Sequence, residues 1–202
     1  MKITRIAQQV KLPGRYSVYV DGEYSFSLSE TALLESGLAS GRELTDGELQ
    51  QFQRLSEEDK MYAQALRYVA ARMHSSWEMQ TYLERKGGSP ALTEIILNKL
   101  TELGLIDDFK YARMFVGERR RLRYSSRRKI MYELQKKHIS DSAITAALSE
   151  EPEGEQTALQ TLIANKRRQT KYQDNEKLLQ YLARQGYNYG DIKQAISAST
   201  ED

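Results

Sequence analysis

The sequence YLERKG at residues 82–87 returns as ELQKKH at residues 133–138 and as YLARQG at residues 181–186. The leucines of these stretches, Leu83, Leu134 and Leu182 (the anchor leucines), lie 51 and 48 residues apart. A period in this range is typical of stacked supersecondary units. The chain is therefore predicted to contain three tandem repeats.

Each anchor leucine lies in a segment with the pattern of an amphipathic helix. The residue four positions earlier is apolar and shares its helix face, and the residue eight positions earlier can cap the helix start. The apolar residues are Met79, Ile130 and Leu178, and the capping residues are Ser75, Ser126 and Asp174. The helix that follows carries Ile96 and Leu100, then Ile144 and Leu148, then Ile192 and Ile196. Since a longer helical segment precedes each anchored helix, we predict three helices per repeat. The alternative is an ordinary helical bundle whose leucines align by chance.

Residues 15–28, RYSVYVDGEYSFSL, alternate apolar and polar side chains on both sides of an Asp-Gly pair, which predicts a β-hairpin. A loop of odd length would bring four apolar residues to one face, namely Tyr16, Val18, Tyr24 and Phe26. We therefore expect a three-residue loop with a left-handed Gly22. Because a lone hairpin is marginally stable, residues 1–14 are expected to supply a further strand.

Helix signals follow the hairpin. Ser29 can cap a short helix that ends at Gly37, and Thr45 with Glu48 has the spacing of a capping box. Acidic joints lie at residues 105–108 and 150–156, where Pro152 and Gly154 stop a helix. The expected division is a β-hairpin with short helices at residues 1–55 and three-helix repeats at residues 56–106, 107–150 and 151–202.

The composition restricts the class of protein. The 202-residue chain is 40% hydrophobic and 29% charged, which is typical of a folded soluble protein. It contains no cysteine, which excludes disulfides, Cys-based zinc sites and thiol nucleophiles. Neither a signal-peptide core nor an apolar run of about 18 residues is present. We expect a cytoplasmic protein without a membrane segment.

Charge is segregated along the chain. Residues 1–60 hold 7 basic and 10 acidic side chains, whereas residues 110–138 hold 11 basic side chains against two acidic ones. The net charge of the whole chain is only +2, so the basic segment is a local feature. A polyanion is the natural partner of such a segment.

The basic residues gather in ERRRLRYSSRRK at residues 118–129 and KRRQTK at residues 166–171. Arginine can bind phosphate through two parallel hydrogen bonds, and an intervening tyrosine can stack on an exposed base. The candidate residues for binding DNA or a protein filament on DNA are Arg119, Arg120, Arg121, Arg123, Arg127, Arg128, Lys129, Lys166, Arg167, Arg168 and Lys171. The candidates for base stacking are Tyr124 and Tyr172. The alternatives are a solvated helix face for the cations and core packing for the tyrosines.

No arrangement typical of an enzyme is evident. His74 and His138 are the only histidines, and His138 occupies a position that is glycine in the other two repeats, as expected for a loop residue. Adjacent Asp107 and Asp108 would not converge on one metal ion in a helix, so a helix cap is expected there. No phosphate-binding G-x-x-x-x-G-K-[ST] motif is present. We expect no catalysis, no cofactor and no metal.

The helix endings, with GLIDDFKYARMFV at residues 104–116 and YLARQGYNYGDIKQAI at residues 181–196, resemble the RecX regulatory proteins. The resemblance covers residues 61–197, and the hairpin region followed by LASGRELTDGEL is similar to an N-terminal extension of some members. The family often has glycines where this chain has Tyr124, Ser126 and His138, so these turns are expected to differ.

The resemblance implies a fold, a partner and a role. The family fold is an elongated, curved array of three-helix repeats that can lie in the groove of a filament of the RecA recombinase. The implied protein is a non-enzymatic monomer of the bacterial cytoplasm that binds RecA and its single-stranded DNA filament. It would inhibit filament growth, ATPase activity and strand exchange, with roles in DNA repair, recombination and the SOS response.

Two other functions remain open from the residues alone. One is a helical-repeat protein that binds nucleic acid without RecA, and the other is a protein-interaction adaptor whose acidic joints meet a basic partner. Binding to nucleic acid should weaken steeply with salt, whereas an adaptor should show little of this dependence.

Overall fold

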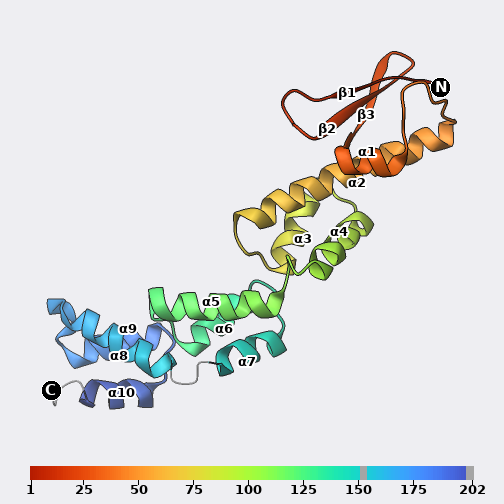
Figure 1. The fold of residues 1–202 in the computed structure, drawn as a ribbon. Coiled ribbons are helices and arrows are strands. Elements are labelled where there is room, and N and C mark those ends of the chain that lie inside the picture. Colours follow the sequence, from red (N-terminus) through yellow and green to blue (C-terminus); the bar gives the residue numbers. More distant parts are fainter. Residues whose placement is uncertain (151–153, 199–202) are drawn as a thin grey trace. The chain divides into compact units, whose positions relative to one another are not determined.

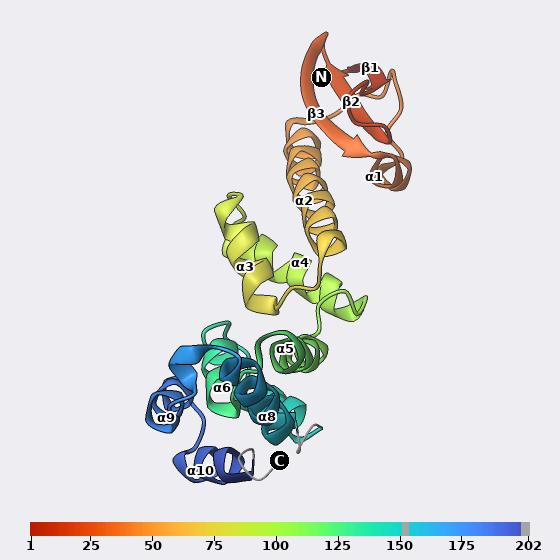
Figure 2. The same cartoon turned by 90° about the vertical axis from the view of Figure 1, so that its left-hand side faces the viewer.

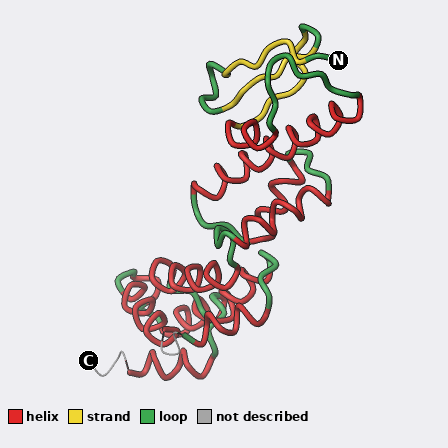
Figure 3. Tube along the Cα trace, turned by 45° about the vertical axis from the view of Figure 1, so that its right-hand side comes forward, coloured by secondary structure: helices red, strands yellow, loops and turns green. Residues whose placement is uncertain are grey.

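The computed structural model describes residues 1–150 and 154–198, which form helices and one small N-terminal sheet (Figures 1 and 3). The strands are β1 (Ile3–Gln8), β2 (Arg15–Val20) and β3 (Glu23–Ser29). The helices are α1 (Glu30–Ser36), α2 (Asp46–Ala71), α3 (Ser76–Arg85), α4 (Pro90–Glu102), α5 (Asp108–Arg123), α6 (Arg127–Gln135), α7 (Asp141–Ser149), α8 (Gly154–Arg167), α9 (Asn175–Arg184) and α10 (Tyr189–Ala198). A short 3₁₀ helix, η1 (Thr170–Tyr172), precedes α9. The mainly helical class with a small N-terminal β region is confirmed.

The chain divides into two compact units. Unit one contains Met1–Arg72 and Met79–Glu102, and unit two contains Met73–Glu78 and the chain from Leu103 onward. None of the helices in the described part of the chain is long and apolar enough to cross a bilayer.

The sheet has the strand order β1-β2-β3 with antiparallel pairs. β1 is the further strand expected before the hairpin. Val20 pairs with Glu23, so the loop between β2 and β3 holds only Asp21 and Gly22, with φ angles of 49° and 92°. Two-residue loops with positive φ match the natural twist of paired strands. The left-handed Gly22 is confirmed, but the three-residue loop was wrong.

A β-bulge supplies the extra residue that the loop lacks. Val18 pairs with Phe26, whereas the next residue, Tyr19, pairs with Tyr24. Val18 and Phe26 therefore share the buried face, while Tyr24 lies beside Tyr19 on the other face and is 52% exposed. The expected grouping of Tyr24 with Phe26 fails because a bulge shifts the register inside the strand, where the alternation pattern does not reveal it.

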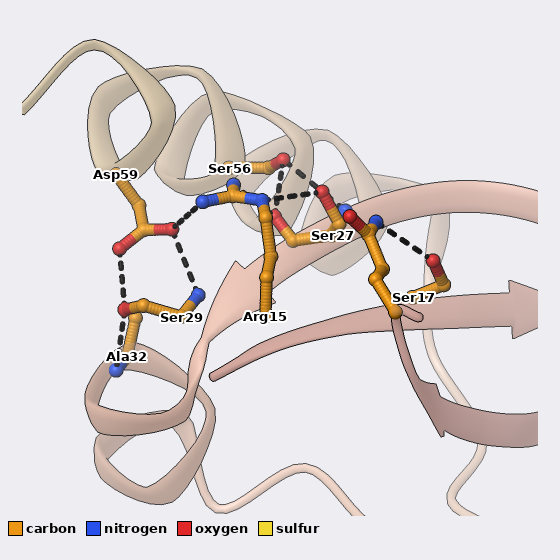
Figure 4. Close-up of polar contacts among 8 residues, drawn as sticks. Arg15, Ser17, Ser27, Ser29, Ala32, Ser56 and Asp59 are labelled. Carbon is orange, nitrogen blue, oxygen red and sulfur yellow. Dashed lines mark hydrogen bonds and ion pairs between the residues drawn. The ribbon is translucent and has the colours of Figure 1, made fainter. Parts of the chain in front are cut away.

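Polar contacts fasten the sheet to α2 within unit one (Figure 4). The Arg15 guanidinium lies 2.9 Å from the Asp59 carboxylate, and the Ser29 backbone N–H donates to the same carboxylate at 2.8 Å. The Ser56 hydroxyl donates to the carbonyl oxygen of Ser27 at 2.7 Å. The hairpin region is thus held on a helix that also carries the first helical segment of repeat one.

The helix α2 begins at the expected capping box. The Thr45 hydroxyl accepts from the Glu48 backbone N–H at 3.2 Å, and the Glu48 carboxylate accepts from the Thr45 backbone N–H at 2.8 Å. The helix then continues for 26 residues. The expected division between residues 55 and 56 falls inside α2, so no linker separates the two parts at this point. The domain limits stay a prediction.

All three anchor leucines are fully buried, and so are the apolar residues four positions before them. In unit two, repeats two and three each have a core of their own, and α5 packs against α7 and α8. Figure 2 shows α5 beside α8. The core of repeat two includes Ala112, Phe115, Ile130, Leu134, Ile144 and Leu148. That of repeat three includes Leu159, Leu162, Leu178, Leu182, Ile192 and Ile196. The predicted tandem three-helix repeats are confirmed.

The expected caps are also present. The Ser126 hydroxyl accepts from the Lys129 backbone N–H at 3.2 Å, and the Asp174 carboxylate accepts from the second and third residues of α9. The Asp107 carboxylate accepts from two backbone N–H groups of α5, which confirms a cap at this position. Of the second acidic joint, Pro152 lies outside the described residues.

The turns after the anchored helices share one backbone conformation. Gly87 and Gly186 both have a φ of 89°, and His138 has a φ of 56°. Tyr124, after α5, has a φ of 48°. The turns at His138 and Tyr124 therefore hold a left-handed residue without glycine, whereas Ser126 has a φ of −66°. The expected difference from the family's turns stays a prediction.

Candidate nucleic-acid interface

The two basic segments of the sequence lie on consecutive elements of unit two. The first covers the C-terminal half of α5 and the start of α6, and the second covers the end of α8 and η1. Their side chains fall into two groups, those bound within the unit and those exposed.

Arg120 belongs to the interior. Its side chain is 7% exposed, and its guanidinium donates to the carbonyl oxygen of Ser125 at 3.2 Å and lies 4.0 Å from the Glu155 carboxylate. The residue therefore joins the end of α5 to α8. Its expected place on a binding surface was wrong, because periodicity does not show that an acidic side chain of the next repeat lies opposite.

Arg119 is also engaged within repeat two. Its Nε donates to the Glu133 carboxylate at 2.6 Å, and its guanidinium lies 4.3 Å from the centre of the Phe115 ring. An ion pair of this kind neutralises the charge locally. Arg119 therefore links α5 to α6 and offers little charge to a partner.

The next four arginines differ from these two. They are exposed, and their guanidinium groups have no acidic partner among residues 1–150 and 154–198; these are Arg121, Arg123, Arg127 and Arg128. Lys129 is half-buried, and its ammonium donates to the side-chain carbonyl of Gln185 at 2.8 Å. The exposed cations of this segment therefore lie at the end of α5 and the start of α6.

The second basic segment is divided in the same way. The Arg167 guanidinium donates to the carbonyl oxygen of Gln173 at 2.7 Å and to the Asn175 side chain, which ties α8 to the start of α9. The Lys166 ammonium lies 4.7 Å from the centre of the Tyr181 ring. Arg168 and Lys171 are exposed.

Both tyrosines proposed for base stacking contribute to packing. Tyr124 and Tyr172 are half-buried and lie against the core of repeat three. The Tyr187 hydroxyl donates to the Tyr124 carbonyl oxygen at 2.6 Å, and burial raises the pKa of this hydroxyl above its usual value. Core packing, the alternative left open by the sequence, describes these two tyrosines.

An exposed tyrosine that the sequence interpretation passed over lies on α6. Tyr132 is 57% exposed, and the Lys136 ammonium lies 4.5 Å from its ring centre. The signal was in the spacing, because Arg128, Tyr132 and Lys136 follow one another at intervals of four and share a helix face.

Two cavities adjoin these residues. A cavity of about 1070 Å³ between α5 and α8 is lined in part by Arg121, Tyr124 and Thr161. A groove of about 490 Å³ is lined by Arg127, Arg128 and Tyr132 of α6, and by residues from the turn before α10. Both combine apolar and cationic side chains with carboxylates, which are Glu118 in the cavity and Glu155 and Asp191 in the groove.

The histidines belong to unit two, where His74 lies in the first segment and His138 in the turn between α6 and α7. His74 is buried with its Nδ1 3.4 Å from the Glu78 carboxylate, and the His138 ring stacks on the Trp77 ring with centres 4.7 Å apart. Within the described part of the chain, no group of three side chains could hold a metal ion. The positions of both histidines fit packing roles.

The chain matches three family models along its length. Residues 1–45 match the regulatory protein RecX N-terminal domain, residues 62–100 the first three-helix domain of RecX, and residues 107–148 the second.

Whole-chain relatives agree with these matches. A regulatory protein RecX of Oceanobacillus iheyensis is 31% identical over 213 residues, covering 100% of this chain and 78% of its own length. One from Lactobacillus johnsonii is 32% identical over 148 residues, or 73% of this chain, and the match spans 54% of that relative's length. The chain therefore matches little more than half of that longer relative.

A solved structure extends the agreement to the fold. A crystal structure of regulatory protein RecX has a TM-score of 0.76 and 27% identity, and the match covers 97% of this chain and 98% of the other. The chain belongs to the RecX family of regulatory proteins.

Proposed function

We propose that this protein is a non-enzymatic regulator that binds the RecA recombinase and its single-stranded DNA filament. It inhibits filament growth, ATPase activity and strand exchange, and acts as a monomer in the cytoplasm during recombination and DNA repair. Membership in a family of regulatory proteins supports this proposal.

The observation that carries the proposal is the exposed arginine group of α5 and α6. Arg121, Arg123, Arg127 and Arg128 present planar, permanently charged donors to solvent, and their guanidinium groups form no ion pair within the described residues. Guanidinium groups of this kind bind phosphate in two-point contacts. A nucleoprotein filament offers phosphates at regular intervals to such a surface.

Tandem repeats add a second element. We propose that the four parts of the chain, with limits near residues 55, 106 and 150, act as linked contact modules. Contacts made by linked modules raise the overall affinity without any single strong contact. Binding several filament subunits at once would block subunit addition and strand exchange.

Reversal of two exposed charges tests the role of the arginines. Arg121→Glu together with Arg123→Glu should weaken inhibition of RecA's ATPase strongly, because repulsion replaces two phosphate contacts. If both contacts are to single-stranded DNA, the slope of log affinity against log salt should become less negative by about 1.4. Fluorescence anisotropy on labelled single-stranded DNA measures that slope.

The matched control reverses two exposed cations of unit one. Lys11→Glu together with Arg54→Glu makes the same change in net charge and should leave inhibition near that of the unmodified protein. Equal effects of the two double variants would contradict a specific role for the α5 and α6 arginines.

The same arginines also favour a second candidate, a nucleic-acid-binding protein that acts without RecA. Five phosphate contacts on a single strand would give a salt slope of about −3.5. Binding with such a slope, combined with unchanged RecA activity, would favour this second candidate. A protein-interaction adaptor would not show this salt-dependent binding to nucleic acid.

A further inference from the structure

The helix α6 presents an aromatic side chain between two cations on one face. Arg128, Tyr132 and Lys136 are four residues apart, so their side chains follow one another along the helix. Tyr132 is 57% exposed, although the core of repeat two lies on the other side of its helix. Lys136 lies over the ring at 4.5 Å and can cover only one of its two faces.

Tyr132 also forms a wall of a groove. The groove has a volume of about 490 Å³, within the range of small-molecule sites, and its α6 wall includes Arg127 and Arg128. Asn188 and Asp191, at the start of α10, and Glu155 of α8, which accepts from the Arg127 backbone N–H at 2.7 Å, contribute amide and carboxylate groups to the lining. Cationic donors, an aromatic face and polar groups that can both donate and accept hydrogen bonds therefore meet in one place.

This combination matches one nucleotide of a single strand. A base can stack on a tyrosine ring, and stacking tolerates any sequence because every base has a π face. Guanidinium groups beside the ring can bind the flanking phosphates, and amide or carboxylate groups can reach the edge of an unpaired base. A duplex keeps its bases stacked inside, and an acidic peptide would gain only from the cations.

We infer that the α6 groove is a binding site for single-stranded nucleic acid, with Tyr132 as its base-stacking residue and Arg127 and Arg128 as its phosphate-binding residues. The inference deepens the proposed function, which supplies single-stranded DNA as the strand. It assigns stacking to Tyr132 in place of Tyr124 and Tyr172, whose rings pack against the core of repeat three.

The test measures binding of the full chain to a fluorescein-labelled oligothymidylate by anisotropy, without RecA. Tyr132→Leu removes the aromatic ring, and Tyr132→Phe keeps it. Tyr189→Leu is the matched control, because Tyr189 is 54% exposed and lies beneath the Lys193 ammonium at 4.9 Å but is not part of the groove lining. Thermal melts verify that each variant is folded.

We expect Tyr132→Leu to weaken binding at least about fivefold, as for loss of one stacked base, and both other variants to bind within about twofold of the unmodified protein. An abasic oligonucleotide of equal length should bind the unmodified protein and Tyr132→Leu equally. Full-strength binding by Tyr132→Leu, or an equal loss on the abasic strand, would overturn the inference. The inference would also be overturned if Tyr132→Leu lost binding only to polyglutamate, because that result would indicate an acidic peptide as the ligand.

RecA's ATPase, measured with the same variants, separates the two proposals. If the unmodified protein inhibits RecA while Tyr132→Leu binds oligothymidylate normally, the stacking site is refuted and the regulator remains. If Tyr132→Leu loses strand binding while the unmodified protein leaves RecA unaffected, the regulator is refuted and the stacking site remains.

Discussion

Position 138 holds a histidine in a backbone conformation that glycine adopts at the equivalent positions of the other two repeats. A left-handed conformation costs a residue with a Cβ atom roughly 1–2 kcal/mol. The stacking of the His138 ring on the Trp77 ring offsets part of this cost, since aromatic pairs contribute about 0.5–1.5 kcal/mol. The His138 ring therefore gains its contact with Trp77 while the backbone at position 138 remains strained.

We predict that His138→Gly is more stable than His138→Ala by about 1 kcal/mol, because both lose the ring but only alanine keeps the strain. Lys136, with a φ of −62°, provides the control, and there alanine should be the more stable by about 0.5–1 kcal/mol. Urea denaturation, followed by the fluorescence of Trp77, measures both pairs. The explanation would be contradicted if the same substitution, glycine or alanine, were the more stable one at both positions.

Single residues also show where sequence reasoning reached its limit. The burial of the anchor leucines follows from their spacing, and the structure agrees. The interior position of Arg120 does not follow, because its acidic neighbour, Glu155, lies 35 positions away on α8. Long-range pairing of this kind leaves no local pattern, so the arginines could be identified as a group but not sorted into bound and exposed members.

At the scale of elements, Ser126 joins repeats two and three. Its hydroxyl accepts from the Lys129 backbone N–H at the start of α6 and donates to the Gln185 carbonyl oxygen at the end of α9. Gly186 lies against it, since a Cβ atom at that position would approach the Ser126 hydroxyl oxygen to 2.7 Å. Ser126 therefore caps α6 and also forms the surface on which the turn after α9 packs.

We predict that Gly186→Ala destabilises the protein by about 1 kcal/mol more than Gly87→Ala does. Both glycines have a φ of 89°, so the strain is equal, but only the alanine at 186 displaces the capping hydroxyl. In a Ser126→Ala background the extra cost should disappear. Urea denaturation measures this coupling, and an unchanged extra cost in that background would exclude Ser126 as its cause.

The N-terminal hairpin shows how far patterns predict an element. Alternation identified the strands, and the Asp-Gly pair located the turn. The loop length was wrong, because an inserted residue in a strand and one in a loop produce the same alternation. The register shifts between Val18 and Tyr19, so the extra residue lies in β3, the strand that packs against α2.

At the scale of the whole molecule, unit two contains the exposed arginines and, among its described residues, Lys137 and Tyr187, whose pKa values are raised on folding. Burial alone would lower the pKa of Lys137, but its hydrogen bonds to Glu78 and Tyr111 raise it above 10.5. Burial raises the pKa of Tyr187 above 10.0. In alkaline solution these two groups therefore hold their protons more strongly in the folded chain than in the unfolded chain, and their contribution to stability falls as pH rises.

We predict a loss of stability of unit two that begins at about pH 9, where the tyrosine of the unfolded chain first releases its proton. Tyr187→Phe cannot ionise, so it should lose less stability than the unmodified protein between about pH 9 and pH 11. Urea midpoints across this range measure the difference. Parallel pH profiles for the two proteins would contradict the role of Tyr187.

The most direct measurement is the single-stranded-DNA-dependent ATPase rate of RecA from the same organism. The protein is titrated from well below to above the RecA concentration at two salt concentrations. We predict inhibition below one molecule per RecA subunit, because a bound repeat array blocks growth of a whole filament, with weaker inhibition at the higher salt. Unchanged ATPase above equimolar protein at both salt concentrations would contradict the account.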